Sequence, residues 1–216
     1  MPVAGADYAI RFAKLLLISV QPSLQWHDGS APTSIESLLS CRLIALYKNP
    51  GIRPIGVCEV ARRIIGKVIL LVTSLHIQRA AGPLQLCTGQ EAGIEAAVHT
   101  IQSLIEQDET ESVLLVDAQN AFNSLNRQIG LINNRMVCLI LSKILVNTYR
   151  SPTHLCVGGE TLLSCEGVTQ GDPLAMAMYA LASIPLIRRI RTDHARQVWF
   201  TADATAGGKL TATKDW

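Results

Sequence analysis

A run of apolar residues that ends on a carboxylate, at residues 113–117, constrains this chain more than any other stretch. Its sequence is Val-Leu-Leu-Val-Asp, and a continuous run of Val and Leu predicts a buried β-strand. Asp117 follows where the chain leaves the core, and a carboxylate at such a strand end is well placed to hold a divalent metal ion. Taken alone, however, an Asp at a strand end is more often structural.

The apolar spacing elsewhere predicts helices interleaved with hairpins. Helices are expected at residues 59–80, 90–106, 134–150 and from Pro173 to about 191, and hairpins at 43–57, 153–165 and 197–211. The first two helices each carry an apolar face, formed by Val60, Ile64, Val68 and Leu71 and by Ile94, Val98, Ile101 and Ile105. Because strands and helices do not alternate regularly, this pattern favours an α+β fold with an antiparallel sheet over a doubly wound fold.

Composition sets broad limits on size and partners. A chain of 216 residues that is 49% hydrophobic is expected to form one domain or two closely joined lobes. A net charge of +2 does not by itself indicate a nucleic-acid-binding protein. Six basic residues and only one acidic residue nevertheless cluster in one region: Arg42, Lys48, Arg53, Arg62, Arg63 and Lys67. The cluster predicts either a solvated helix face or a surface that contacts phosphates.

Cysteine usage and hydropathy bear on the cellular location. The six cysteines include no Cys-x-x-Cys pair, so a zinc site is not expected. Scattered cysteines without a signal-peptide pattern favour reduced thiols in an intracellular protein, cytoplasmic or nuclear. No run approaches the ~20 apolar residues of a membrane helix, so no membrane partner is expected. Residues 1–33 are expected to form an N-terminal helix and loop, and residues 34–216 one domain.

Three short motifs then follow one another along the chain. The first is Asp-x-x-x-Ala-Phe, in which Phe122 lies five residues after Asp117. The second is Gln-Gly-Asp-Pro-Leu, which begins with Gln170 and Gly171. The third is Phe-Thr-Ala-Asp, which ends with Asp203. Together with Arg-Pro-Ile-Gly-Val at residues 53–57, these motifs resemble the palm motifs of reverse transcriptases, most closely those of retroelements (retrotransposons).

The resemblance implies a fold and a set of roles. The fold would be the fingers and palm of a right-hand polymerase, with an antiparallel palm sheet. The activity would be template-directed addition of deoxynucleotides to a primer on RNA or DNA, which makes the chain an RNA-directed DNA polymerase, a nucleotidyltransferase. Asp117 and Asp203 would be catalytic and would hold Mg²⁺, or Mn²⁺ in its place.

The remaining site residues would bind the deoxynucleoside triphosphate. Phe122 would act as the gate beneath the sugar, Gln170 and Gly171 would lie beside the nucleotide, and Lys48 and Arg53 would hold the triphosphate. From spacing alone, an ordinary core residue is the favoured interpretation of Phe122. The alternative interpretation of Lys48 and Arg53 is that they lie on a plain surface hairpin and only keep it soluble.

Two departures from the family pattern bear on activity. An ungapped match to the family's aromatic-x-Asp-Asp hairpin places Ala202 at the first, metal-binding Asp and Asp203 at the second. A one-residue shift would make Asp203 the first, but it would also turn the side chains to the other face of the sheet. The match also ends before a thumb, so a truncated domain is expected. The alternatives are therefore an impaired enzyme, a catalytically dead relic (a pseudoenzyme) with weak nucleic-acid or nucleotide binding, and a structural α+β domain.

Overall fold

The computed structural model describes residues 38–49 and 51–216, which divide into two compact units. The first unit contains the described residues up to Thr73, together with Pro152–Cys165 and Thr169–Leu174. The second contains Ser74–Ser151, Glu166–Val168 and Ala175–Trp216. The helix and loop predicted for residues 1–33 lie outside the described residues. Both units mix helices with sheets, so the predicted α+β class is confirmed at this level.

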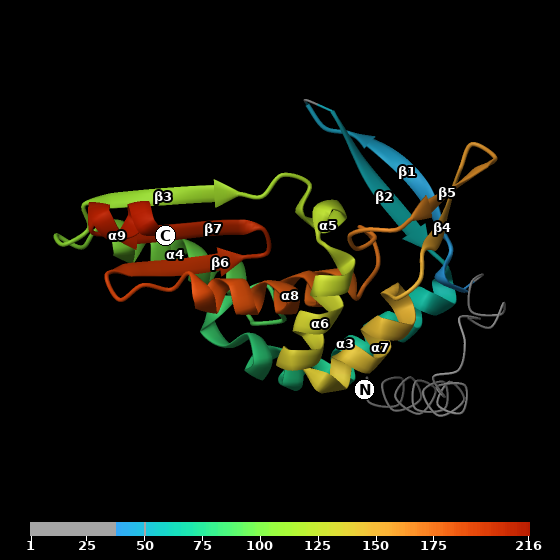
Figure 1. The fold of residues 1–216 in the computed structure, drawn as a ribbon, viewed down its shortest axis with the longest axis horizontal. Coiled ribbons are helices and arrows are strands. Elements are labelled where there is room, and N and C mark those ends of the chain that lie inside the picture. Colours follow the sequence, from blue (N-terminus) through green and yellow to red (C-terminus); the bar gives the residue numbers. More distant parts are fainter. Residues whose placement is uncertain (1–37, 50) are drawn as a thin grey trace, which may run out of the picture. The chain divides into compact units, whose positions relative to one another are not determined.

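The first unit is built on a four-stranded sheet in the order β2-β1-β4-β5 (Figure 1). The strands are β1 (Cys41–Tyr47), β2 (Ile52–Cys58), β4 (Thr153–Val157) and β5 (Glu160–Ser164). Two antiparallel hairpins, β1–β2 and β4–β5, are joined through parallel pairing of β1 with β4. The predicted hairpins are therefore present, but the sheet is mixed and not purely antiparallel.

Local turn chemistry explains the β4–β5 hairpin. Its loop is Gly158–Gly159, and both residues have positive φ, 57° and 87°. A two-residue hairpin loop with two positive φ values requires residues that tolerate the left-handed region, and glycine does so without steric cost. Helix α3 (Val60–Ala81) follows β2, and the boundary between the two units falls inside this helix, after Thr73.

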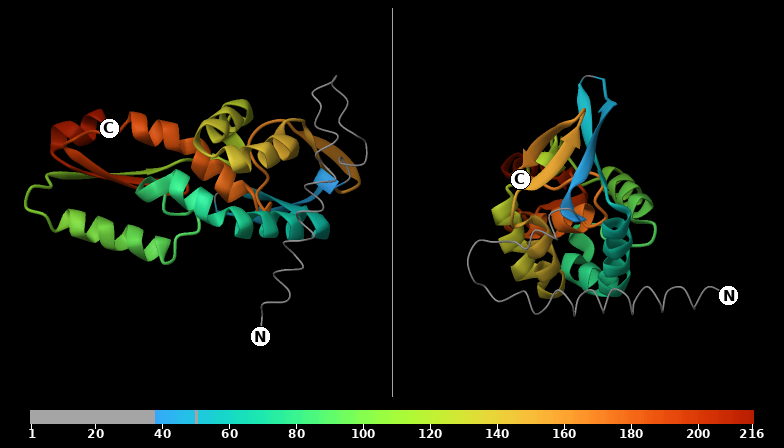
Figure 2. Two further views of the ribbon diagram at one scale, coloured as in Figure 1. Left: turned by 90° about the horizontal axis from the view of Figure 1, so that it is seen from below. Right: turned by 90° about the vertical axis from the view of Figure 1, so that its right-hand side faces the viewer.

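The second unit contains a three-stranded antiparallel sheet in the order β3-β7-β6 (Figure 1). The strands are β3 (Ser112–Asp117), β6 (Ala195–Phe200) and β7 (Asp203–Gly208). Helix α4 (Gly93–Ile105) packs on β6 and β7, as Figure 2 shows, and α9 (Leu210–Asp215) packs on β3 and β7. The central strand β7 is rich in Ala and Gly, and these small residues let α4 approach the sheet closely.

Helices form the rest of the second unit. Helix α6 packs against both α7 and α8. The bounds of these helices, and of the short helix before them, are α5 (Ala121–Ser124), α6 (Arg127–Val137), α7 (Leu139–Tyr149) and α8 (Ala175–Arg189). Their facing sides bury Leu141, Leu145, Met178, Leu181 and Ile184 completely. This cluster is the main apolar core of the unit.

The prediction that residues 113–117 form a buried strand is wrong in one respect. The strand exists as β3, but it lies at an edge of the sheet, and Leu115 is 72% exposed. Leu114 and Val116 are exposed as well. A continuous apolar run shows that neither face of a strand is polar, but it does not show that both faces are covered.

The apolar faces predicted for the first two helices are also largely uncovered. In α3, Val60, Ile64 and Leu71 are exposed, although Val68 is buried. In α4, Ile94, Val98 and Ile105 are exposed and Ile101 is half-buried, while Ala97 and Leu104 are buried. No helix in the described part of the chain has both the length and the hydropathy to cross a membrane.

Two predicted boundaries differ from the observed ones. The single helix expected at 134–150 is two helices, α6 and α7, which break at Cys138 where the backbone turns to φ −144° and ψ 86°. In the last hairpin the returning strand is β7, and residues 209–211 lead into α9 instead of forming that strand.

We expect the contact between Leu104 and Gly207 to be sensitive to volume. A Cβ atom at Gly207 would lie 1.9 Å from Leu104 Cδ2, and Leu104 is buried. Gly207→Ala should therefore cost about 1–3 kcal/mol of unfolding free energy through overpacking, and Leu104→Ala about 2–5 kcal/mol through the cavity it leaves. The double variant should lose less than the sum, because the new methyl group partly fills that cavity.

Urea denaturation of the three variants measures these free energies, with Leu115→Ala as a control at an exposed leucine. The control should change stability by no more than about 0.5 kcal/mol. Strictly additive losses in the double variant would contradict the packing described.

Candidate functional site

The two predicted metal ligands are brought together by strand pairing. Asp117 is the last residue of β3, Asp203 is the first residue of β7, and the two are register partners. Directly opposed residues on antiparallel strands project from the same face, with Cβ atoms about 4.5–5.5 Å apart. Both carboxylates are exposed, so they can be reached by an ion from solution. The pairing of β3 with β7 therefore brings together in space two carboxylates that lie far apart in the sequence.

The loop between β6 and β7 determines where Asp203 begins its strand. Phe200 pairs with Asp203, which leaves Thr201 and Ala202 as the two loop residues. The backbone N–H of Ala118 donates to the carbonyl oxygen of Ala202 at 3.3 Å, which ties the loop to the residue after Asp117. The methyl group of Ala202 thus lies one residue before the carboxylate that is opposite Asp117.

The donor set suits one divalent ion better than two. Two carboxylates fit a magnesium ion, which commonly keeps several of its waters and takes one or two carboxylates from a protein. Two ions a few ångströms apart would need further ligands. Within residues 38–49 and 51–216, no group of three His, Cys, Asp or Glu side chains is placed to hold a metal ion.

Tyr179 of α8 belongs to the surroundings of these carboxylates, and sequence reasoning missed it. Burial raises the pKa of its phenol above the usual value, and Cys87, when ionised, and the carboxylates of Asp117 and Asp203 raise it further. The phenol is therefore protonated at neutral pH and available as a hydrogen-bond donor. No sequence signal singled out this tyrosine, because it lies in a helix whose pattern indicates only an Ala- and Met-rich core.

Phe122 lies in α5 against Tyr179. The two ring centroids are 5.1 Å apart at an interplanar angle of 31°. Its carbonyl oxygen accepts a hydrogen bond from the N–H of Val168 at 2.7 Å, and its side chain is half-buried. Phe122 is therefore fixed at the site by both backbone and ring, and it is neither a fully buried core residue nor a free surface group.

Arg127 holds the segment that contacts Phe122. Its Nε donates to the carbonyl oxygen of Gly167 at 2.9 Å and its Nη2 to that of Glu166 at 2.8 Å. Its backbone N–H, at the first turn of α6, donates to the carboxylate of Glu166 at 3.1 Å. A buried guanidinium thus fastens residues 166–167 to α6 and keeps Val168 against Phe122.

The Gln170-Gly171 turn lies in the first unit, on the outer edge of β2. The N–H of Gly56 donates to the carbonyl oxygen of Gln170 at 2.7 Å. Gly171 has φ +106°, and a Cβ atom there would lie 2.4 Å from the carbonyl oxygen of Gly56, so only glycine fits. The Oε1 atom of Gln170 is buried and has no hydrogen-bond partner within the described residues. This acceptor is therefore left without a donor from the described part of the chain.

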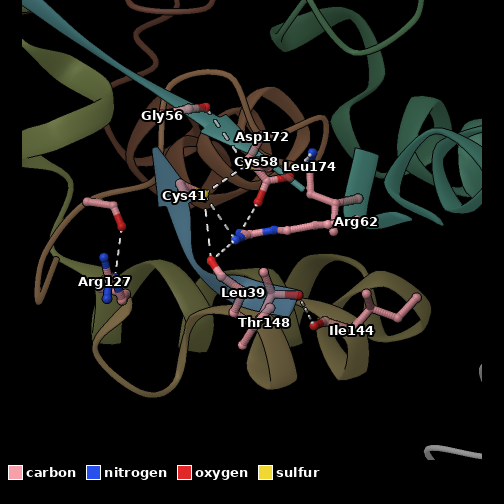
Figure 3. A network of polar contacts seen from close by, with 11 residues as sticks. Leu39, Cys41, Gly56, Cys58, Arg62, Arg127, Ile144, Thr148, Asp172 and Leu174 are labelled. Carbon is pink, nitrogen blue, oxygen red and sulfur yellow. Dashed lines mark hydrogen bonds and ion pairs between the residues drawn. The ribbon is translucent and has the colours of Figure 1, made fainter. Parts of the chain in front are cut away.

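A buried ion pair fixes the same turn from the other side (Figure 3). The Nη2 atom of Arg62, in α3, lies 2.5 Å from Oδ2 of Asp172, and the two side chains are 6% and 1% exposed. Asp172 also accepts from the N–H of Leu174 at 2.9 Å, and Arg62 donates to the carbonyl oxygen of Leu39. The prediction that the basic cluster forms one phosphate-facing surface is therefore wrong for Arg62, because its guanidinium is buried and paired with the carboxylate of Asp172.

Two cysteines line this ion pair. Cys41 and Cys58 are register partners on β1 and β2, and their Sγ atoms are 3.0 Å apart. Arg62 Nη1 lies 3.4 Å from the Sγ of Cys41. The hydrogen bond from Cys58 and the charge of Arg62 lower the pKa of Cys41 below its usual value. Both thiols are buried and free.

Lys48 and Arg53 lie near the tip of the β1–β2 hairpin, as predicted. Lys48 follows β1, and its backbone N–H donates to the carbonyl oxygen of Gly51 at 3.0 Å. Arg53 is the register partner of Leu46. Both cations are exposed, and so is Tyr47, the last residue of β1. The predicted site residues therefore divide between the units: Asp117, Phe122 and Asp203 lie in the second, and Lys48, Arg53, Gln170 and Gly171 in the first.

Comparisons with known proteins bear on the fold. Neither a protein-family profile nor a curated protein matches the sequence. Apo telomerase from Candida tropicalis, truncated from its C-terminal domain, matches with a TM-score of 0.58 and 11% identity over 82% of this chain and 45% of that chain. Apo telomerase from the same organism matches with a TM-score of 0.60 and 9% identity, over 87% and 42% of the two chains.

Telomerase from Candida albicans in complex with the TWJ fragment of telomeric RNA matches with a TM-score of 0.59 and 8% identity, over 94% and 43% of the two chains. This chain thus spans less than half the length of each of these telomerases. Telomerase is a reverse transcriptase. The chain therefore has, at a coarse level, a reverse transcriptase-like fold.

The phenol of Tyr179 gives a titration test of the site. Asp117→Asn or Asp203→Asn should lower the pKa of Tyr179, because each removes a negative charge that opposes formation of the phenolate. The double variant should lower it further and still leave the part of the shift that burial causes. Ultraviolet absorbance of the phenolate as a function of pH measures this, with Tyr179→Phe to assign the transition.

The matched control is Asp215→Asn in α9, which has no part in raising this pKa. A pKa of Tyr179 that did not respond to either aspartate would mean that the carboxylates are farther from the phenol than described.

Proposed function

We propose that this chain is a reverse transcriptase-like domain whose reaction is template-directed addition of deoxynucleotides to a primer, and that Ala202 impairs this reaction. The observation that carries the proposal is the direct register of Asp117 with Asp203 on neighbouring strands. Two carboxylates on one face, together with the half-buried ring of Phe122 against Tyr179, whose pKa both carboxylates raise, would provide a place for a metal-bound phosphate and a sugar. The shared fold with telomerase supports the same class of chemistry.

Asp117 and Asp203 would hold one Mg²⁺ or Mn²⁺ ion. When bound, such an ion neutralises charge on phosphate oxygens. The two carboxylates would hold the ion in position, and Phe122 would limit the space beneath the sugar. Tyr179 remains a neutral phenol that can donate a hydrogen bond near the carboxylates.

The first unit carries its own candidate nucleotide-binding residues. Gln170 Oε1 is a buried acceptor without a partner in the described residues, and an amine or hydroxyl donor on a nucleotide would satisfy it. Lys48 and Arg53 are exposed and carry no salt bridge in the described part of the chain, so they are available for phosphate oxygens. The partners would then be a deoxynucleoside triphosphate and an RNA or DNA template with its primer.

The second candidate function is binding without catalysis. It is favoured by the loop residue Ala202, which offers no ligand where the family resemblance places a carboxylate. A retrotransposon-derived relic with two carboxylates would retain weak binding of a divalent ion, a nucleotide or nucleic acid. The two functions differ in whether any nucleotide is transferred, and the first experiment addresses the metal site that both share.

Ala202→Asp should tighten Mn²⁺ binding by at least about tenfold, or about 1.4 kcal/mol. The added carboxylate would lie in the loop next to Asp203 and would give the ion a third ligand. Manganese titration followed by electron paramagnetic resonance measures the free ion directly. Adding Asp117→Asn to Ala202→Asp should abolish the gain.

The control is Gln107→Glu, which adds the same charge in an exposed turn of the same unit. If it tightened Mn²⁺ binding as much as Ala202→Asp, the effect would be general electrostatic attraction, and the proposed metal site would be wrong.

Arg53→Ala should weaken binding of a deoxynucleoside triphosphate several-fold, because it removes a charge near the tip of the β1–β2 hairpin. Arg135→Ala is the matched control, since Arg135 is an exposed arginine in α6. Isothermal titration calorimetry on both variants gives the two affinities. Equal losses of affinity in the two variants would mean that Arg53 is only a surface charge that keeps the hairpin soluble.

A further inference from the structure

The loop that carries Ala202 contains a backbone conformation that its sequence does not favour. Thr201, the first loop residue, has φ +58°. Positive φ is a genuine outlier for a β-branched residue, and such conformations persist only where the surrounding structure imposes them. Ala202 is not among the residues with positive φ, so the unfavourable geometry falls on Thr201. Contacts made to Thr201 from outside the hairpin are therefore of particular interest.

Gln85 makes such contacts. Its Oε1 accepts a hydrogen bond from the backbone N–H of Thr201 at 2.7 Å, and its Nε2 donates to the carbonyl oxygen of Thr201 at 3.0 Å. One side-chain amide thus satisfies both backbone groups of a single residue, as a neighbouring strand would. The side chain of Gln85 is completely buried, so water does not compete for these bonds.

The residues after Gln85 contact the same hairpin. The backbone N–H of Leu86 donates to the carbonyl oxygen of Trp199 at 2.9 Å. Cys87 hydrogen-bonds with Thr201, and these bonds lower its pKa against the larger upward effect of burial. The connection between η1 (Gly82–Leu84) and α4 therefore runs alongside the end of β6 and its loop. All of these residues belong to the second unit.

We infer that Gln85 is a positioning residue for the proposed metal site: by holding Thr201 at positive φ, it sets the Thr201–Ala202 loop and thereby keeps Asp203 opposite Asp117. The inference rests on the proposed function for its consequence at the metal, but the clamp itself does not. A buried glutamine can also be no more than a satisfied core residue. The two roles differ in one respect, because only a positioning role makes the need for Gln85 depend on the residue at 201.

Thr201→Gly provides that distinction. Glycine adopts φ near +58° without steric cost, so the loop no longer needs to be held. In a chain with Ala202→Asp, Gln85→Leu should weaken Mn²⁺ binding by about tenfold or more, a difference of about 1.4 kcal/mol. Adding Thr201→Gly to this variant should recover most of the lost affinity. Gln90→Leu is the matched control, because Gln90 in the same connection donates to the carbonyl oxygen of Gly82 and does not contact the loop.

Amide hydrogen exchange by NMR tests the clamp without any metal. In the chain without the Ala202→Asp substitution, Gln85→Leu should speed hydrogen exchange of the Thr201 N–H at least tenfold. Gln90→Leu should leave the exchange rate unchanged. If Gln85→Leu does not fold, Gln85→Met replaces it in both experiments, since methionine has a side chain of similar length and offers Thr201 neither the amide donor nor the amide acceptor of Gln85.

The outcomes separate the inference from the proposed function. If Ala202→Asp fails to tighten Mn²⁺ binding, the proposed metal site is wrong, and exchange at Thr201 alone decides whether the clamp exists. Unchanged exchange in the Gln85 variant overturns the inference. It is equally overturned if Mn²⁺ affinity falls with Gln85→Leu and Thr201→Gly restores none of it, because the loss is then a general effect on the core.

Discussion

The antiparallel pairing of β3 with β7 is the interaction on which the candidate site depends. It brings two aspartates from distant parts of the chain, Asp117 and Asp203, into direct register. A slip of one residue would turn one of the two carboxylates to the other face of the sheet. Packing opposes such a slip, since Leu104 of α4 fits the space above Gly207, where no side chain could be accommodated. The register of the two aspartates is therefore a consequence of apolar packing elsewhere in the same unit.

In the first unit a buried charge pair has the equivalent role. Arg62 and Asp172 are removed from water, and such a pair adds little net stability but is costly to break, by about 3–5 kcal/mol when one partner is lost. Its effect is to fix the Gln-Gly-Asp turn to α3, while Gly56 and Gly171 allow the backbone of the turn to approach the edge of β2. The acceptor of Gln170 is thereby held in place without a partner in the described residues. Most buried polar side-chain atoms have a hydrogen-bond partner, so this acceptor is an exception within its unit.

The position of Asp203 and the backbone preference of Thr201 make opposing demands on the β6–β7 loop. A two-residue loop fixes Asp203 at the start of β7, but it places a β-branched residue at positive φ. The buried amide of Gln85 offsets this unfavourable geometry with two hydrogen bonds. The chain keeps this support although the loop offers a methyl group at Ala202 and no third ligand. The scaffold for a metal site is thus more complete than the site itself.

The sequence by itself determined most of the local structure and the identity of the candidate site residues. Turn residues such as Gly158–Gly159 marked the hairpins, apolar spacing marked the helices, and the motifs around Asp117, Gln170 and Asp203 indicated a polymerase-like palm. These features depend on neighbours in the chain, so they can be read without coordinates.

Only the tertiary structure decided which faces are covered and which polar groups meet. It placed the apolar strand β3 at an edge, left the predicted apolar faces of α3 and α4 largely exposed, and buried Arg62 against Asp172. It also brought Tyr179 to the carboxylates and Gln85 to Thr201. The physical reason is that burial and hydrogen bonding between distant residues are set by long-range packing, whereas periodicity and turn chemistry are properties of a few consecutive residues.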